Sequence, residues 1–402
     1  MNAFFKTSPG SYFLLAFPAL ASSLELLRAW IFTGFPWLEV GTLQVFGPFS
    51  NFAPLIGGPG CSLLSYFFGG FLGYVLYSRK LGLLWKNLGL LLLSFLSFMG
   101  LGFILNHPSY TQTMGPSISV SLVQGNIPQS LKWDPNNLLL SLNHYDQALA
   151  HTKSELMLWP ESAIPLFQTE AGAYLDSLNH YADNHSIALI SGIPLMSLKS
   201  SRYFNGALGL GRASGSYKKV HLVPFGETIP LKSLVGSIFE FLQVPLSDFS
   251  AGNSEQALIQ AKIHSQKIPI AVFICYETAY ADYVRKIAKQ SELLAALSDD
   301  AWFGHSEGPY QHLQINQMRA LENQRFLLNA TNNGITAIIS PQGKILSRLP
   351  AFKNSSLNAF VFARKGETPW ERWGEFPEIL SLLLMFIFSR ITQIKHLINK
   401  KF

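Results

Sequence analysis

Three long apolar stretches near the N-terminus limit what this chain can fold into. Residues 52–77 contain no charged side chain, residues 81–105 contain one, and residues 12–32 contain two. Each stretch is long enough to cross about 30 Å of hydrocarbon as a helix. Only 13% of all residues are charged, against about 25% in an ordinary soluble domain. The sequence therefore predicts a chain that lies partly in a membrane.

The first stretch also allows a second interpretation. Lys6, a short apolar run and Ala19-Leu20-Ala21 match the parts of a secretory signal peptide with a cleavage site. As a retained helix, the stretch carries Glu25 and Arg28 three residues apart, on one helix face. We expect these two charges to form a structural ion pair.

A fourth candidate span lies near the C-terminus. Residues 376–394 have an apolar core of only about ten residues, so length alone is ambiguous. Aromatic side chains precede the stretch and basic side chains follow it, as at the two faces of a membrane: Trp370, Trp373, Lys395, Lys400 and Lys401. We therefore expect a final transmembrane helix with a cytoplasmic tail.

The net charge of +6 belongs to the two ends of the chain. Residues 111–375 carry 21 basic and 21 acidic side chains, so the excess does not indicate a nucleic-acid surface. Lys6 and the group of Arg79, Lys80 and Lys86 flank the predicted spans. Basic residues favour the cytoplasmic side of a membrane. If both basic groups lie in the cytoplasm, the middle section lies outside it.

The middle section shows the strand and helix pattern of a layered α/β domain. Strands are expected at residues 118–122, 156–159, 187–193, 205–210, 268–275 and 293–298. Helices are expected at residues 138–151, 279–290 and 310–328. The predicted organisation is a membrane part (1–110), an α/β domain (111–375), and a last span with its tail (376–402).

Cys275 is the first candidate for chemistry in this domain. It ends an apolar strand just before a helical pattern, where a thiol gains exposure and the positive end of a helix dipole. The other cysteine, Cys61, lies in an apolar stretch, and no disulfide framework or zinc-ligand spacing is present. Most buried cysteines are inert apolar side chains, so a catalytic assignment needs partners for the thiol.

Carboxylates and lysines lie where such partners would be needed. Glu161 follows Trp-Pro at the end of a strand, Glu277 lies two residues past the cysteine, and Glu227 follows Pro-Phe-Gly. The pair Lys218-Lys219 lies beside an apolar segment and offers a positive group for a developing oxyanion. Each of these residues alone is more often a solvated surface charge.

Together these residues resemble the nitrilase, or carbon-nitrogen hydrolase, superfamily, which uses a Glu–Lys–Cys triad. Three segments carry the resemblance: Trp159-Pro160-Glu161, residues 219–227 (KVHLVPFGE), and Ile274-Cys275-Tyr276-Glu277. Longer strings narrow it to the apolipoprotein N-acyltransferase family: residues 123–133, 300–304 and 331–336, with 32–37 in the membrane part.

The resemblance implies a fold, an activity and a site. The family fold is an α-β-β-α sandwich on a helical transmembrane domain. The family moves an acyl chain from a phospholipid to the N-terminal amine of a diacylglyceryl-cysteine apolipoprotein, through a thioester. By motif match, Cys275 would be the nucleophile, Glu161 the general base and Lys219 the stabiliser of the oxyanion. Four further residues match supporting positions: Trp133, Glu227, Tyr276 and Glu277.

The resemblance also implies a setting for the enzyme. It places the chain in the bacterial inner membrane, with several spans and a periplasmic catalytic domain, and it implies no metal and no cofactor. Family members carry further spans ahead of the first one here, so a shortened N-terminal membrane region is expected. Asp299 stands where the family usually has Asn. The match continues through residues 24–37 and speaks against cleavage of the first stretch.

Two other functions and one structural feature remain as expectations. The same triad would serve a membrane-tethered amidase or nitrilase, in which water replaces the lipoprotein amine. A non-enzymatic membrane scaffold is a third possibility, and it gives the triad no role. Residues 231–249 are apolar with few charges and would form either a lipid-facing lid or a helix that caps the core.

Overall fold

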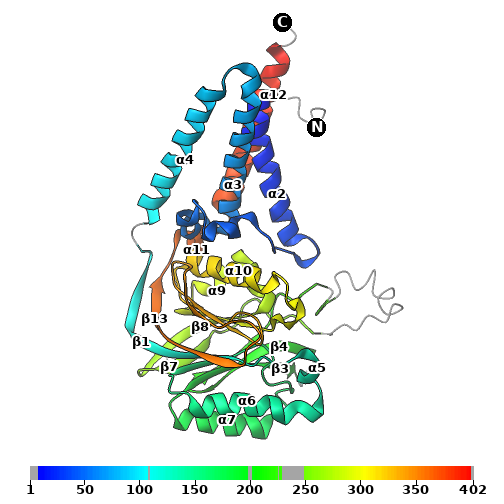
Figure 1. Ribbon diagram of the computed structural model, residues 1–402, viewed down its shortest axis with the longest axis vertical. Coiled ribbons are helices and arrows are strands. Elements are labelled where there is room, and N and C mark those ends of the chain that lie inside the picture. Colours follow the sequence, from blue (N-terminus) through cyan, green and yellow to red (C-terminus); the bar gives the residue numbers. More distant parts are fainter. Residues whose placement is uncertain (1–7, 107–108, 198–201, 225, 229–248, 400–402) are drawn as a thin grey trace, which may run out of the picture. The chain divides into compact units, whose positions relative to one another are not determined.

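The computed structural model describes residues 8–106, 109–197, 202–224, 226–228 and 249–399 (Figure 1). The chain divides into two compact units, one of Met1–Tyr110 with Thr368–Phe402 and one of Thr111–Glu367. Except for Phe249, the predicted lid lies outside the described residues.

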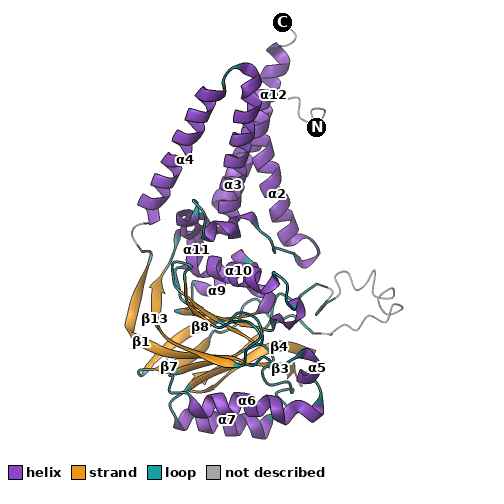
Figure 2. Cartoon of the chain, viewed as in Figure 1, coloured by secondary structure: helices purple, strands orange, loops and turns teal. Residues whose placement is uncertain are grey.

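The unit of Thr111–Glu367 is built on two β-sheets (Figure 2). The first sheet has the strand order β13 (Ser355–Gly366), β1 (Thr111–Gln124), β2 (Leu156–Trp159), β3 (Ala188–Ser197), β4 (Arg202–Gly211) and β6 (Ser216–Lys218). The second has the order β12 (Ile345–Arg348), β11 (Ala337–Ile339), β10 (Leu327–Thr331), β9 (Leu293–Ser298), β8 (Gln266–Ile274), β7 (Ile259–Ile263) and β5 (Ala213–Ser214). The central strands β1–β2–β3 and β8–β9–β10 are parallel.

The alternation of side chains along β2 shows how the layers are held together. Leu156 and Leu158 point into a core that also contains side chains of the second sheet, such as Val272. Met157 and Trp159 point to the opposite face and pack with residues of two helices. Because successive side chains of a strand face opposite sides, this fully buried strand contributes to two cores.

Helices cover both outer faces of the sandwich (Figure 1). The helices α6 (Leu138–His151) and α7 (Gly172–Asn184) pack on the first sheet, and α9 (Ala281–Ala288) and α10 (Gly308–Asn323) on the second. The layers are therefore α-β-β-α, which confirms the predicted fold class.

The predicted elements agree with the structure at most positions. The strands β2 and β9 and the helix α6 begin and end at the predicted residues. The predicted helix over 310–328 was too long. It ends at Asn323 because Gln324 adopts a left-handed conformation (φ 46°), and Leu327 begins a strand that pairs with β9.

Among the described residues of the other unit, four helical segments are long and apolar enough to cross a membrane: Pro9–Thr33, Ser50–Leu81, Leu84–Asn106 and Phe376–Lys395. Their main helices are α2 (Phe17–Trp30), α3 (Ala53–Ser78), α4 (Leu84–Asn106) and α12 (Phe376–Asn399). The predicted Glu25–Arg28 ion pair is confirmed, with 3.9 Å between Oε1 and Nη2. Glu25 also accepts hydrogen bonds from the Tyr66 hydroxyl and the Val40 amide.

A glycine near the start of α3 allows close packing within the same unit. Gly57 has φ 69°, and a Cβ at this position would lie 2.7 Å from the ring of Trp370. Trp370 is fully buried and belongs to the short helix α11 (Pro369–Trp373). Position 57 therefore requires glycine for both its backbone conformation and its neighbour.

Candidate active site

The ends of parallel strands from the two sheets bring the predicted site residues together. Glu161 follows β2 in the first sheet, while Cys275 and Asp299 follow β8 and β9 in the second. The Asp299 amide donates a hydrogen bond of 2.8 Å to Glu161 Oε2, which joins the two sheets at this edge. Side chains beyond the carboxyl ends of parallel strands commonly form the functional site of α/β proteins.

Glu161 is buried and fully engaged by donors. Its Oε1 accepts a hydrogen bond of 2.6 Å from Asn205 Nδ2, and its Oε2 accepts the hydrogen bond from the Asp299 amide. Burial raises the pKa of Glu161, the neighbouring Glu227 carboxylate adds to this, and the Lys219 ammonium opposes it. A raised pKa makes this carboxylate a better proton acceptor than a solvated one.

Lys219 lies between two carboxylates. Its Nζ is 2.7 Å from Glu227 Oε2 and 3.8 Å from Glu161 Oε1, and its side chain is 1% exposed. Burial alone would lower the pKa of Lys219, but Glu227 and Glu161 outweigh burial and raise it. Lys219 is therefore a permanent cation inside the protein.

Glu227 is the closer partner of this cation. Burial opposes its ionisation, yet the Lys219 ammonium lowers its pKa below the usual range. Asn205 donates to Glu227 Oε1 at 2.9 Å as well as to Glu161, so one amide spaces the two carboxylates. Of the two carboxylates beside Lys219, Glu227 therefore has the lowered pKa and Glu161 the raised one.

Cys275 occupies a strained turn immediately after β8. It has φ 54° and begins the short 3-10 helix of Cys275–Ala279, whereas α9 begins only at Ala281. Enclosure by protein raises the pKa of the thiol well above its ordinary value; the Glu161 carboxylate adds to this and Lys219 opposes it. The resting group is therefore a neutral thiol, which needs a base before it can attack.

Glu277 connects the cysteine turn to the segment that carries the lysine. Its carboxylate accepts hydrogen bonds from the Ile274 and Val220 amides at 2.8 and 2.6 Å. It also accepts the Tyr217 hydroxyl at 2.7 Å. Because Glu277 is fully buried, these bonds hold the two segments in register.

The remaining two predicted residues, Tyr276 and Trp133, differ from each other in burial. Tyr276 is buried and makes an edge-to-face contact with Tyr280, with 5.3 Å between ring centroids. Trp133, the residue after α5 (Gln129–Lys132), is 52% exposed. Of the seven predicted residues, the structure thus joins five through hydrogen bonds, ion pairs or electrostatic contact: Glu161, Lys219, Glu227, Cys275 and Glu277.

Sequence reasoning missed three polar residues of this site. Asn205 was placed only in a strand, Lys132 only in a family string, and Asp299 only as a departure from the family. Lys132 Nζ is 2.5 Å from Asp299 Oδ2 and 2.9 Å from the Glu161 carbonyl oxygen, and it is buried. The position of Lys132 within the family string of residues 123–133 was the local signal for this buried ion pair.

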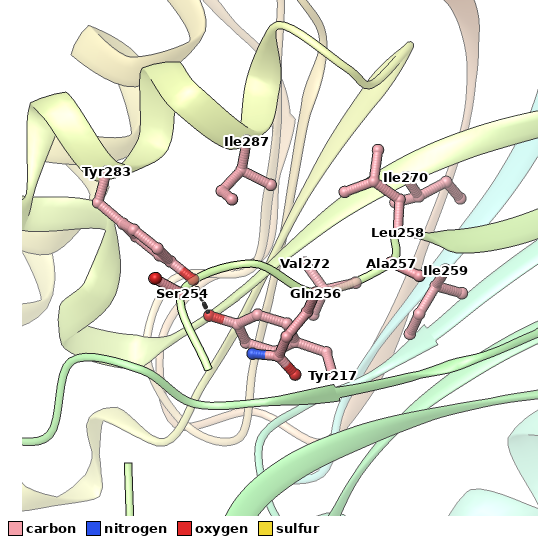
Figure 3. Close-up of a pocket in the computed structure, with 10 residues that line it drawn as sticks. All are labelled: Tyr217, Ser254, Gln256, Ala257, Leu258, Ile259, Ile270, Val272, Tyr283 and Ile287. Atoms are coloured by element: carbon pink, nitrogen blue, oxygen red, sulfur yellow. Dashed lines mark hydrogen bonds between the residues drawn. The ribbon is translucent and has the colours of Figure 1, made fainter. Parts of the chain in front are cut away.

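A small pocket lies beside the Glu277 network (Figure 3). The hydroxyls of Tyr217 and Tyr283 are 2.8 Å apart on its wall, and apolar residues such as Val272 and Ile287 line the rest. Its lining contains none of the three predicted triad residues. This pocket is therefore separate from the place where Glu161, Lys219 and Cys275 meet.

Comparison with known proteins agrees with this geometry. Residues 119–361 match the carbon-nitrogen hydrolase family, and residues 2–71 match the apolipoprotein N-acyltransferase N-terminal domain. An apolipoprotein N-acyltransferase of Pseudomonas aeruginosa is 40% identical over 370 residues, which cover 90% of this chain and 70% of that protein. An apolipoprotein N-acyltransferase of Coxiella burnetii is 38% identical over 375 residues, which cover 93% of this chain and 76% of that protein.

Solved structures with more distant similarity were also found. A carbon-nitrogen hydrolase superfamily protein of Xanthomonas campestris is 17% identical, with a TM-score of 0.45, and covers 66% of this chain and 97% of that one. An amidase of Nesterenkonia is also 17% identical, with a TM-score of 0.45, and the match covers 62% of this chain and 93% of that one.

This chain has an α-β-β-α sandwich with a cysteine, a lysine and glutamates at the ends of its strands. These features and the family match define its class as the carbon-nitrogen hydrolases. Within that class, the chain belongs to the apolipoprotein N-acyltransferase family, as the two family matches and the full-length relatives show. The resemblance noted in the sequence is confirmed. Together with its four long apolar helices, this membership makes the chain a membrane protein.

Proposed function

We propose that this acyltransferase moves an acyl chain from a phospholipid to the N-terminal amine of a diacylglyceryl-cysteine apolipoprotein, by way of a thioester on Cys275. Family membership and the N-terminal family match favour this function over a membrane-tethered amidase. The observation that carries the site assignment is the buried Lys219 ammonium between Glu161 and Glu227, within electrostatic reach of the Cys275 thiol.

In the first half-reaction, Glu161 accepts the thiol proton while the sulfur attacks the ester carbonyl carbon of the phospholipid. Negative charge develops on the carbonyl oxygen, and the Lys219 ammonium offsets it. The tetrahedral intermediate collapses, the C–O bond breaks, and the leaving alkoxide of the lysophospholipid takes the proton from Glu161. The products are a thioester on Cys275 and a lysophospholipid.

In the second half-reaction, the lipoprotein amine attacks the thioester carbonyl carbon, and Glu161 accepts a proton from the nitrogen. The C–S bond breaks as the amide forms, and the sulfur regains its proton from Glu161. Because one nucleophile serves both displacements, the kinetics should be ping-pong. The neutral resting thiol explains why the base must lie beside the nucleophile.

The membrane setting supports the lipid donor and suggests an orientation. The four apolar helices would hold the enzyme in the same phase as an insoluble acyl donor. The bases at Lys6 and at residues 79–86 favour a cytoplasmic location for those segments, so the catalytic unit would lie in the periplasm of the inner membrane. Protease digestion of intact spheroplasts tests this side, because only a periplasmic unit would be cleaved.

A labelling experiment tests the function directly. Membranes containing the protein are incubated with a phospholipid that carries a radiolabel in its acyl chain, without lipoprotein. The wild type should acquire a label that hydroxylamine removes, and Cys275→Ser should not acquire that thioester. Cys61→Ser is the matched control, since Cys61 is the other free cysteine and lies buried in the membrane unit. An unlabelled wild type, or a thioester in Cys275→Ser, would exclude this mechanism.

A further inference from the structure

A histidine that the catalytic scheme does not use lies directly behind the nucleophile. His312 is on α10, is 1% exposed, and has polar atoms opposite both of its ring nitrogens. Nδ1 is 2.9 Å from Asp300 Oδ1, and Nε2 is 3.2 Å from the carbonyl oxygen of Cys275. The Thr278 hydroxyl also lies 3.2 Å from Nε2.

These partners favour the protonated form of the ring. A neutral imidazole has one N–H and one lone pair, so one nitrogen would direct its lone pair at an oxygen acceptor. The Thr278 hydroxyl has a single hydrogen, which can serve either Nε2 or the Cys275 carbonyl oxygen, 3.4 Å away, but not both. The imidazolium form alone donates to Asp300 and to Cys275 at the same time. Burial disfavours this cation, but the Asp300 carboxylate raises the pKa of His312.

The packing around Asp300 shows that its carboxylate is held next to the His312 ring. Asp300 is 2% exposed and begins the turn after β9. A Cβ on Gly334 would lie 2.2 Å from Asp300 Oδ2, so the absence of a side chain there makes room for the carboxylate. The aspartate is therefore held against the ring and not in solvent.

We propose that Asp300 and His312 form a positioning pair, which holds the strained Cys275 backbone by donating the imidazolium Nε2–H to its carbonyl oxygen. This inference rests on the proposed function of Cys275. A residue other than glycine at φ 54° persists only when its surroundings hold it there. Without this bond the peptide relaxes and the sulfur moves away from Glu161, so the attack slows while lipid binding is retained.

The test compares Asp300→Asn, His312→Gln and the double variant in the full-length protein. Thioester formation from radiolabelled phospholipid is followed in time at several lipid concentrations, below the melting temperature of each variant. A hydrogen bond from a charged donor corresponds to about a 10- to 100-fold effect, so each single variant should lose that factor in maximal rate with an unchanged KM. The double variant should be no slower than the slower single one, because the two residues act as a unit.

The control and the second measurement separate the possible outcomes. His305→Gln makes the same exchange at an exposed histidine in the turn before α10 and should leave the rate unchanged. Alkylation of Cys275 by iodoacetamide, followed by peptide mass spectrometry, should slow in parallel in Asp300→Asn and His312→Gln. Wild-type rates, additive losses, or a raised KM with an unchanged maximal rate would overturn the positioning role. An unacylated wild type whose alkylation still depends on His312 would refute the proposed function but support the pair.

Discussion

Replacing Lys219 with methionine separates two effects that the proposed mechanism assigns to this cation. Methionine keeps the length of the side chain and removes the charge between Glu227 and Glu161, 2.7 and 3.8 Å away. At an effective dielectric constant of about 20, these distances correspond to attractions of about 6 and about 4 kcal/mol. Lys219→Met therefore leaves two buried carboxylates without their counterion.

The first effect is the loss of oxyanion stabilisation. A single donor or charge at that position is worth about 3–4 kcal/mol, so the rate should fall by about a hundredfold or more at any pH. The second effect concerns the base. Lys219 lowers the pKa of Glu161, so its removal raises that pKa further and leaves more of the carboxylate protonated at neutral pH. The acidic limb of the pH–rate profile should therefore move to higher pH.

The assay is the initial rate of thioester formation between pH 5.5 and 9, with the Cys275→Ser rate subtracted. Raising the pH should recover the part of the loss that comes from Glu161 protonation and leave the hundredfold deficit. A full recovery at high pH would show that Lys219 only tunes the base, and a wild-type rate at pH 7 would remove it from the mechanism. Breaking a buried ion pair costs about 3–5 kcal/mol in stability, so Lys219→Met/Glu227→Gln, which removes the closer pair, serves as the folding control.

Two further predictions concern stability. Lys132→Met leaves the buried Asp299 carboxylate without its cation and should lower the free energy of unfolding by about 3–5 kcal/mol, read as an earlier melting transition in detergent. The exposed Lys353→Met is the control, and equal melting temperatures would contradict the role of the ion pair. Gly57→Ala should also melt earlier, because it combines a left-handed backbone with a 2.7 Å contact to a buried indole. Gly69→Ala, in the same helix with no heavy atom within 4 Å of its Cβ, should melt like the wild type.

Local patterns were sufficient to predict the layers of this protein. Residues 156–159 are apolar without alternation, which indicates a strand buried on both faces, and β2 has that burial. Glu161 and Cys275 became candidates because each lies at the end of a predicted strand, and their roles were assigned by motif match. The end of α10 was missed because Phe326-Leu327-Leu328 follow it closely, and a short apolar run does not distinguish a helix from a strand.

The partners of the site residues could not be predicted in the same way. Lys132 and Asp299 are 167 residues apart, and Glu161 is 138 residues from the amide that binds it. Their contacts depend on the order of strands in two sheets, which no local period encodes. His312 looked like one of several scattered histidines until α10 brought it against the cysteine turn.

The sequence by itself determined the long apolar helices and the α-β-β-α fold class. Long uncharged apolar runs have to satisfy their backbone polar groups internally, and in lipid a helix does so within one segment. Only the tertiary structure decided which carboxylate lies nearer the buried Lys219 ammonium, Glu227 at 2.7 Å or Glu161 at 3.8 Å. This difference in distance to one buried ammonium group matters because burial makes each unpaired charge costly and leaves the nearer carboxylate ionised.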